Sequence, residues 1–150
     1  MKIHTKRFGD VEVEDSQIIS MPEGVIGFEE YTRYALLDHS PDSPFKWFQA
    51  VEDPELAFVI TDPFNFVPDY KVDVSKADKD FLSIKDVDEA LILTLVSIKR
   101  ESSSVTANLT GPIVINLETL VAKQVVLSDS PYSSNHDILQ QDSVSSSEVN

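Results

Sequence analysis

Short runs of apolar, β-branched and aromatic residues recur along the chain, and proline or glycine separates most of them. Runs of roughly four to eight such residues, bounded by turn-forming residues, are typical of β-strands. No stretch keeps the apolar spacing of a long core helix. The pattern therefore predicts strands at residues 3–8, 11–13, 18–21, 34–37, 45–51, 57–61, 70–74, 91–98, 105–109, 112–116 and 124–127.

Helical signals are few and local. The hydroxyl of Ser75 can accept a backbone N–H that a first helical turn leaves unpaired, which predicts a helix at residues 76–82. A second short turn is expected at residues 28–31, and Gly9 and Asp10 are expected to form a tight hairpin turn. Many short strands with irregular loops predict an all-β, mainly antiparallel fold. We expect a small bent β-barrel-like domain with one or two short helices.

The chain length of 150 residues fits one domain with a single core. We expect this domain to span residues 1–139. Residues 140–150 are polar and rich in serine. Because they bury too little apolar surface to offset the entropy lost on ordering, we expect them to form a mobile tail.

Charge is abundant and unevenly distributed. The chain has 12 basic and 26 acidic residues, for a net charge of −14. Residues 1–9 carry a net +3, residues 10–69 a net −12 and residues 70–150 a net −5. A field of this sign repels phosphate groups, so it argues against direct binding of nucleic acid, and it attracts basic proteins. The alternative interpretation is that the acidity serves only solubility.

Several kinds of site lack the residues that they need. The absence of cysteine excludes disulfides, thiolate metal sites and thiol nucleophiles. His4, His39 and His136 lack metal-site spacing, and no glycine-rich phosphate loop is present. Ser43 and Lys46 match a Ser-x-x-Lys pattern, but they precede a predicted strand and no Lys-Thr-Gly follows. We therefore expect no catalytic residue, cofactor or metal, and a protein that is not an enzyme.

The expected location is the cytoplasm. Polar and apolar residues alternate at the N-terminus, without the uninterrupted apolar segment of a secretory signal. The longest apolar stretch, residues 90–98, is too short to cross a bilayer. We expect no contact with membranes.

Two sequence features indicate binding of a protein partner. One is a run of acidic residues at positions 52–55 that continues to Asp62. The other is a group of three aromatic residues, two between Pro63 and Pro68 and one shortly after Pro68. Prolines disfavour a central strand, so some of these rings are expected on a loop, where aromatic side chains rimmed by acids can anchor a basic amphipathic helix. Alternatively, Phe64 and Phe66 plug the end of a barrel. The candidate partner-binding residues are Glu52, Asp53, Glu55, Asp62, Phe64, Phe66 and Tyr70.

Three groups of residues also stand in a distinctive order and spacing. The first comprises Phe8-Gly9, Glu12-Val13, Ile18-Ile19 and Pro22-x-Gly24-x-Ile26-Gly27-Phe28-Glu29. The second is Pro44-Phe45-x-Trp47-Phe48-Gln49-Ala50-x-Glu52-Asp53-Pro54-x-Leu56-Ala57-Phe58-Val59-Ile60-x-Asp62-Pro63. The third comprises Thr106-x-Asn108-Leu109-x-Gly111-Pro112-Ile113-Val114-Ile115-Asn116, Gln124-Val125-Val126-Leu127 and Tyr132. Together, from residue 1 to about residue 132, they resemble the FliW family of flagellar assembly factors. This chain departs from the family pattern at Phe48, where leucine is usual, at Ala50, where serine is frequent, and at Gly111, where alanine is common.

The resemblance implies a function without catalysis. Proteins of this family resemble a small β-barrel; they bind unassembled flagellin and, when flagellin is scarce, CsrA, an RNA-binding regulator that blocks translation of flagellin mRNA. The chain is accordingly expected to be a monomer when free, to bind both partners, and to antagonise CsrA allosterically so that flagellin mRNA is translated. Two alternatives remain open: a small β-barrel enzyme acting on an unknown substrate, and a purely structural interaction module.

Overall fold

The structure, a computed structural model, describes residues 1–38, 40–99, 101–127 and 130–138. The expected domain end at residue 139 and the expected tail at residues 140–150 lie outside the described residues. The strands are β1 (Lys2–Thr5), β2 (Gly9–Glu12), β3 (Ile18–Ser20), β4 (Arg33–Asp38), β5 (Phe45–Ala50), β6 (Ala57–Thr61), β7 (Ala90–Lys99), β8 (Ser104–Ala107), β9 (Ile113–Asn116), β10 (Ala122–Gln124) and β11 (His136–Asp137). The helices are α1 (Lys76–Leu82) and three 3₁₀ turns at Asp15–Gln17, Pro63–Asn65 and Val87–Glu89.

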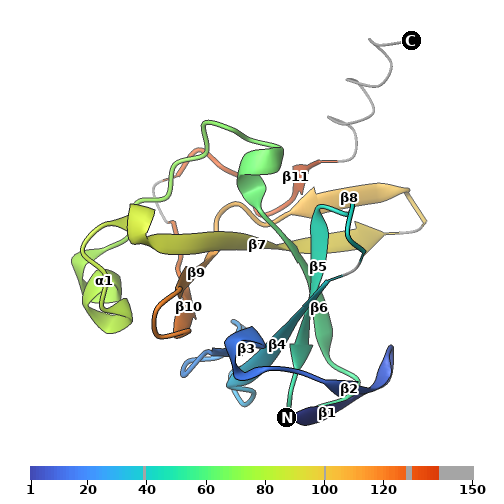
Figure 1. The fold of residues 1–150 in the computed structure, drawn as a ribbon. Coiled ribbons are helices and arrows are strands. Elements are labelled where there is room, and N and C mark those ends of the chain that lie inside the picture. Colours follow the sequence, from blue (N-terminus) through green and yellow to red (C-terminus); the bar gives the residue numbers. More distant parts are fainter. Residues whose placement is uncertain (39, 100, 128–129, 139–150) are drawn as a thin grey trace.

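One strongly curled antiparallel sheet organises the molecule (Figure 1). Its strands follow the order β10-β9-β7-β6-β5-β4-β3, with β8 beside β7 and β11 beside β8, while β1 and β2 form a separate hairpin. The two ends of the sheet meet at a single parallel bridge between Ser20 and Val121. One bridge is not a ladder, so the sheet bends toward closure without forming a closed barrel. The predicted mainly antiparallel β fold is confirmed.

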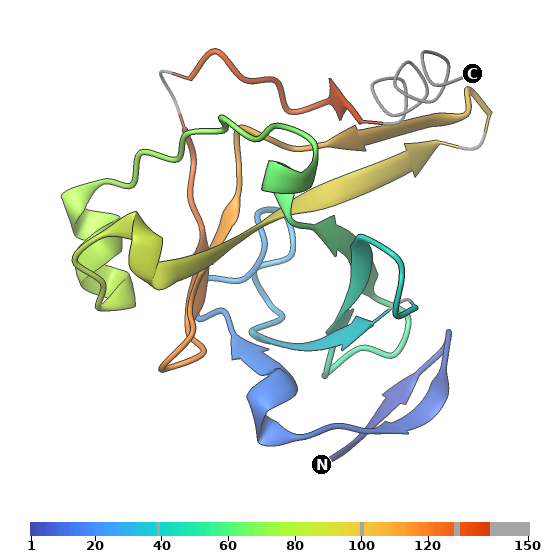
Figure 2. The same ribbon diagram turned by 45° about the horizontal axis from the view of Figure 1, so that its top comes forward.

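Strand β7 connects the parts of the sheet (Figure 2). Its first half pairs with β9, its centre with β6 and its last four residues with β8. Helix α1 lies to one side of β7 and the β1–β2 hairpin lies on the opposite side of the molecule, as Figures 1 and 2 both show. A contact of 2.6 Å between Lys123 Nζ and Asp78 Oδ1 links β10 to α1.

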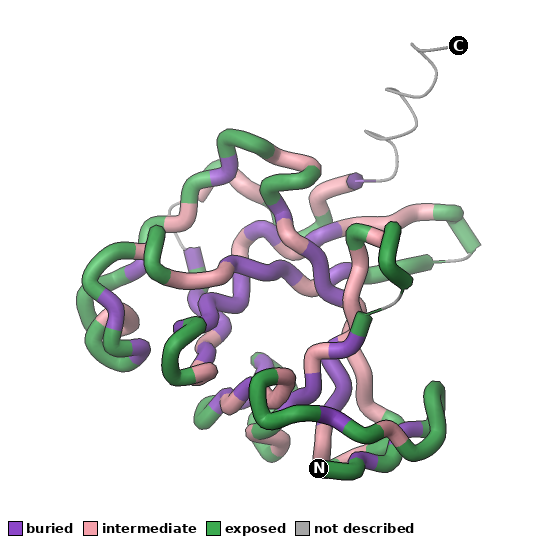
Figure 3. The backbone as a smooth tube through the Cα atoms, viewed as in Figure 1, coloured by how far each residue is buried: buried purple, intermediate pink, exposed green. Residues whose placement is uncertain are grey.

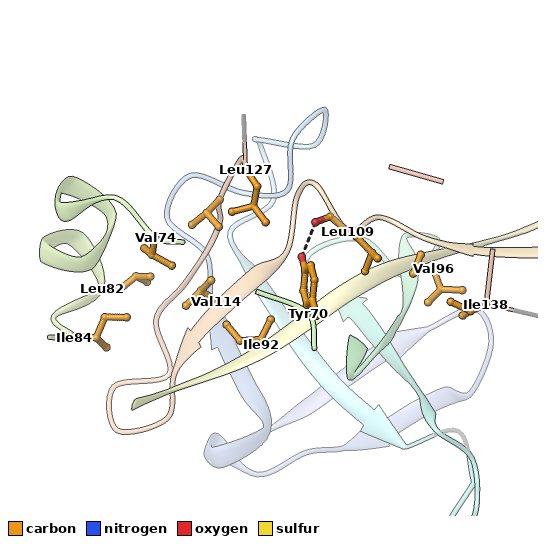
Figure 4. Packing of buried hydrophobic residues seen from close by; sticks show 12 residues of the cluster. Tyr70, Val74, Leu82, Ile84, Ile92, Val96, Leu109, Val114, Leu127 and Ile138 are labelled. Carbon is orange, nitrogen blue, oxygen red and sulfur yellow. Dashed lines mark hydrogen bonds between the residues drawn. The ribbon is translucent and has the colours of Figure 1, made fainter. Parts of the chain in front are cut away.

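Buried side chains line the inside of the curl. Most of β7 and all of β9 and β10 are buried or half-buried, whereas hairpin tips and most turns are exposed (Figure 3). In one buried cluster the rings of Tyr34 and Phe48 stack with their centroids 4.5 Å apart. In a second cluster the hydroxyl of Tyr70 donates to the carbonyl of Leu109 at 2.6 Å (Figure 4). Each fully buried large apolar side chain contributes about 1.5–3 kcal/mol to folding.

The predicted strand at residues 70–74 is wrong. These residues form no strand, although Tyr70 and Val74 are buried and Val72 is half-buried against the same cluster. The backbone N–H of Lys71 donates to the hydroxyl of Tyr132 at 2.9 Å rather than to a neighbouring strand. The alternation of apolar residues here reflects side-chain burial without strand pairing.

The first hairpin turn also differs from its prediction. Thr5 pairs with Gly9, so the turn is made by residues 6–8 and Gly9 and Asp10 already belong to β2. The Thr5 hydroxyl accepts from Phe8 N at 2.8 Å and donates to the Gly9 carbonyl at 2.8 Å. These two bonds close the turn at residues 6–8, before the Gly9–Asp10 position at which the glycine predicts it.

Other local predictions have mixed outcomes. Helix α1 begins as predicted, since the Ser75 hydroxyl accepts from Asp78 N at 3.1 Å. Residues 28–31 form a single turn. The last predicted strand lies earlier in the chain, at β10, and residues 125–127 continue it only through isolated backbone hydrogen bonds. Strand β11 was missed, because two polar residues carry no strand signal.

Among the described residues, no helix has both the length and the apolar character that spanning a membrane requires.

Candidate protein-binding surface

Strand β6 separates the four acidic candidates into two places. Glu52, Asp53 and Glu55 lie in the turn that joins β5 to β6, whereas Asp62 follows the last residue of β6. A strand rises about 3.3 Å per residue, so Asp62 lies about 20 Å from the turn. The structure therefore brings three of the four acids together and places the fourth at the other end of the strand.

The acids of the β5–β6 turn contact the segment at residues 31–32. A carboxylate oxygen of Glu52 accepts from the backbone N–H of Thr32 at 3.3 Å. The Tyr31 hydroxyl donates to Asp53, and this hydrogen bond is the main cause that raises the pKa of Tyr31. Glu55 forms an exposed ion pair with Lys6 at 3.6 Å, an interaction of little energetic weight in water. The turn is thus fixed beside residues 31–32 with its charges facing solvent.

The aromatic candidates lie at the other end of β6, and none belongs to a strand. Asp62 Oδ1 accepts from Phe64 N at 2.9 Å and caps a 3₁₀ turn. The Phe64 side chain is 40% exposed. Phe66 is half-buried against the core and stacks on Phe45 at 6.3 Å, and Tyr70 is only 4% exposed. The segment therefore presents one ring to solvent and holds the other two behind it (Figure 4 shows Tyr70).

A second exposed apolar site lies in the loop between β3 and β4. Its first two turns are closed by hydrogen bonds from the N–H of Gly24 and of Phe28 to the carbonyls three residues earlier, and the turn at residues 28–31 follows them. Gly24 has a φ of +69° and Gly27 a φ of +93°, which side chains of L-residues rarely tolerate. A Cβ atom on Gly24 would lie 2.6 Å from the Cα of Glu29. Both turns therefore depend on glycine.

Gln124 fixes this loop to the body of the protein. Its side-chain oxygen accepts from Ile26 N at 2.9 Å, and its side-chain nitrogen donates to the carbonyl of Gly111 at 3.0 Å. Gln124 itself is buried on β10. A Cβ atom on Gly111 would lie 3.0 Å from that nitrogen, so the glycine at this position leaves room for the amide.

The loop presents two apolar side chains to solvent. Ile26 is 56% exposed and Phe28 is 38% exposed, and the Phe28 ring packs edge-on against Phe58 with centroids 5.2 Å apart. Residues 22–32 and 51–56 together carry six acidic residues and no lysine or arginine. We call this region the acid-rimmed surface; it comprises Ile26, Phe28, Phe58, Glu23, Glu29, Glu30, Glu52 and Asp53.

Of the residues of the acid-rimmed surface, the sequence singled out only Glu52 and Asp53 as candidates. The positive φ angles of Gly24 and Gly27 make the segment between them a structural turn. The available signal was a pair of large apolar residues on either side of Gly27, in a segment too short and too rich in glycine to be a strand. Exposed apolar side chains on a loop held by a rigid scaffold are typical of binding sites.

A cavity of about 510 Å³ lies between the start of α1 and residues 126–127 and 130–132, and its lining includes Asp78, which is paired with Lys123. No group of three or more histidine, aspartate or glutamate side chains placed to hold a metal occurs in the part of the chain that the structure describes. Backbone N–H bonds lower the pKa of Glu29 and of Glu89, both of which are exposed. The enzyme alternative instead requires a buried carboxyl with a raised pKa.

Comparison with known proteins identifies the family. The sequence model of the FliW protein family matches residues 2–138. The chain belongs to the FliW family of flagellar assembly factors. The flagellar assembly factor FliW of Alkaliphilus metalliredigens is 42% identical over 143 residues, covering 94% of this chain and 88% of that protein. The corresponding protein of Treponema denticola is 43% identical over 139 residues, covering 93% and 94%.

A solved FliW structure has the same fold. The crystal structure of a flagellar assembly factor FliW aligns with a TM-score of 0.82 at 33% identity, covering 92% of this chain and 96% of that one. The resemblance inferred from the three residue groups is thus confirmed.

Proposed function

We propose that this FliW-family protein is a cytoplasmic, non-enzymatic assembly factor that binds flagellin and, when flagellin is scarce, CsrA. Membership of a flagellar assembly family supports a role in flagellum construction. The observation that carries the proposal is the placement of the acids. Six carboxylates stand on two adjoining exposed turns beside solvent-facing apolar side chains, as expected of a surface that receives a basic polypeptide.

Exchange of partners gives the protein its regulatory effect. While unassembled flagellin is present, it occupies the factor and CsrA stays on flagellin mRNA. Export of flagellin frees the factor, which then binds CsrA and restores translation. Such a switch requires the binding of one partner to alter the availability of the factor for the other.

Electrostatics supplies the antagonism of CsrA. A protein with net charge −14, docked beside an RNA-binding surface, places negative potential near the incoming phosphates. Screening limits this repulsion to about 8–10 Å at physiological salt, so the docking site on CsrA must adjoin its RNA site. The factor and the RNA then need no shared contact residue on CsrA. An unfavourable coupling free energy between their two sites on CsrA is sufficient.

Flagellin is proposed to use the aromatic segment at the opposite end of β6. Its free termini are expected to be disordered and to become amphipathic on binding. Phe64 offers an exposed ring beside the carboxylate of Asp62, and the buried Tyr70 contacts that ring with centroids 5.8 Å apart. Phe66 packs against the core and stacks on Phe45. The expected contact is an apolar stripe of flagellin packed on Phe64.

Neutralising the candidate acids tests the electrostatic mechanism. In the variant Glu52→Gln, Asp53→Asn, Glu55→Gln, Asp62→Asn, amide side chains keep the shape and can still accept the local backbone hydrogen bonds. We expect this variant to release labelled RNA from CsrA at least about tenfold less effectively than the native protein.

A control variant separates local charge from net charge. Asp42→Asn, Asp88→Asn, Glu101→Gln and Glu118→Gln remove the same number of charges from exposed positions outside the candidate set. This control should release RNA as the native protein does. If the first variant binds CsrA and displaces RNA just as well as the native protein, electrostatic antagonism is excluded.

A further inference from the structure

We propose that Ile26 and Phe28 are the apolar anchor of a docking site for an amphipathic segment of a protein partner, one with an apolar stripe flanked by lysine or arginine. The inference rests on the proposed function, because it assigns part of the partner binding to a surface that the candidate residues only border.

The loop presents Ile26 and Phe28 in a fixed geometry. The exposed Ile26 lies at the tip of a turn closed by a 2.6 Å hydrogen bond from Phe28 N to Val25 O, and its own N–H is bound to the buried Gln124. Glu29 accepts from Gly27 N at 3.0 Å on the outer side of the same turn. A loop held by this many bonds keeps its apolar side chains in water in one geometry, so binding to it loses little conformational entropy.

The exposed Phe28 is also connected to the core by aromatic contacts. Phe28 rests on the half-buried ring of Phe58 on β6, whose neighbour across the core is Tyr34 at 6.1 Å. The Phe28 ring is therefore the outer member of a series of aromatic contacts that reaches the buried Tyr34. A partner side chain placed between Ile26 and Phe28 would bury apolar surface against the Phe28 ring, which the aromatic rings behind it hold in place.

Charge identifies the partner. Glu29 accepts from Gly27 N, and Glu52 accepts from Thr32 N on the adjoining turn. Glu23 is paired with Lys123 at 3.7 Å, but residues 22–32 and 51–56 themselves carry six acidic residues and no lysine or arginine, which leaves an acidic rim. Such a rim repels phosphate and anionic lipid headgroups, and it repels a second copy of the same surface. It favours an apolar helix face with basic edges, for which two anchors about one turn apart are the usual requirement.

The experiment measures binding of purified flagellin and purified CsrA, each separately, to Ile26→Ser and to Ile26→Ser/Phe28→Ser by titration calorimetry. Ile98→Ser and Val126→Ser are matched controls, because these side chains are 54% and 65% exposed and lie outside the acid-rimmed surface. We expect the double variant to weaken binding of at least one partner more than about tenfold, with both controls within about twofold of the native protein. Binding of the affected partner should also weaken as salt is raised.

The outcomes distinguish this inference from the proposed function. If the native chain binds neither protein, the proposed function fails. If the native chain binds them and the double variant, shown by circular dichroism to be folded, binds both with native affinity, this docking site alone is excluded. A second copy of the chain could also occupy the surface, and sedimentation tests for it. If the native protein is a dimer and Ile26→Ser converts it to a monomer, the surface serves self-association and the inference is overturned.

Discussion

The backbone N–H of Ile26 donates to the side-chain oxygen of Gln124 at 2.9 Å, although the two residues are 98 positions apart in the chain. The same amide group donates to the carbonyl of Gly111 at 3.0 Å. One buried side chain thus joins the loop between β3 and β4, strand β10 and the turn before β9. The position of the exposed Ile26 is consequently set by the folded core.

Replacing Gln124 tests this connection. Gln124→Ala leaves the N–H of Ile26 and the carbonyl of Gly111 without their partners, so it should lower the free energy of unfolding by about 1–3 kcal/mol. In Gln124→Glu an ionised side chain can still accept from Ile26 but cannot donate to Gly111, so it should retain part of the loop order. Urea unfolding measures the free energy of unfolding, and hydrogen exchange at the Ile26 amide measures how well the loop protects that amide from solvent. Unchanged protection of Ile26 in Gln124→Ala would show that the amide does not hold the loop.

Two buried tyrosines should respond in opposite ways to loss of the hydroxyl group. Tyr70 donates to the carbonyl of Leu109 at 2.6 Å, so Tyr70→Phe should cost about 1–3 kcal/mol of unfolding free energy because a buried acceptor is left unpaired. The hydroxyl of Tyr34 is buried without a hydrogen-bond partner among the described residues, so Tyr34→Phe should leave stability unchanged or raise it. Thermal unfolding of the two variants side by side provides the measurement, and equal losses would contradict the assignment.

Tyr34 also predicts a dependence of stability on alkaline pH. The pKa of Tyr34 is raised from its ordinary value of about 10 to about 12, and burial is the largest cause. The folded state favours the neutral phenol, so the contribution is fully present below pH 10 and is lost as pH rises from about 10 to about 12. Between pH 9 and pH 11.5 the native protein should lose more stability than Tyr34→Phe in urea titrations. Parallel losses in the two proteins would assign the alkaline instability to other groups.

The aromatic segment should separate into a contact residue and a core residue. Phe64 is 40% exposed, so Phe64→Ala should change the unfolding free energy by less than about 1 kcal/mol while weakening capture of flagellin. Phe66 packs against the core and stacks on Phe45, so Phe66→Ala should cost about 2 kcal/mol or more. Differential scanning calorimetry and a flagellin pull-down measure the two effects. A large fall in melting temperature for Phe64→Ala would make Phe64 a core residue.

The sequence predicts most strands because they are apolar runs, most of them bounded by proline or glycine, and it predicts α1 because Ser75 is a strong cap. It fails at residues 70–74, where alternating burial occurs without a partner strand. It also groups Asp62 with the turn acids, since separation along an extended strand is not visible in a list of charges. The exposure of Ile26 depends on Gln124, which is distant in sequence, and no local pattern reports such a contact.

Direct competition between the two partners tests the proposed switch. Fluorescently labelled CsrA is equilibrated with the native protein, unlabelled flagellin is added in steps, and the fraction of bound CsrA is followed by anisotropy. We predict that CsrA binds in the absence of flagellin and is released as flagellin occupies the protein. Failure of both proteins to bind, or binding of both to saturation without mutual effect, would contradict it.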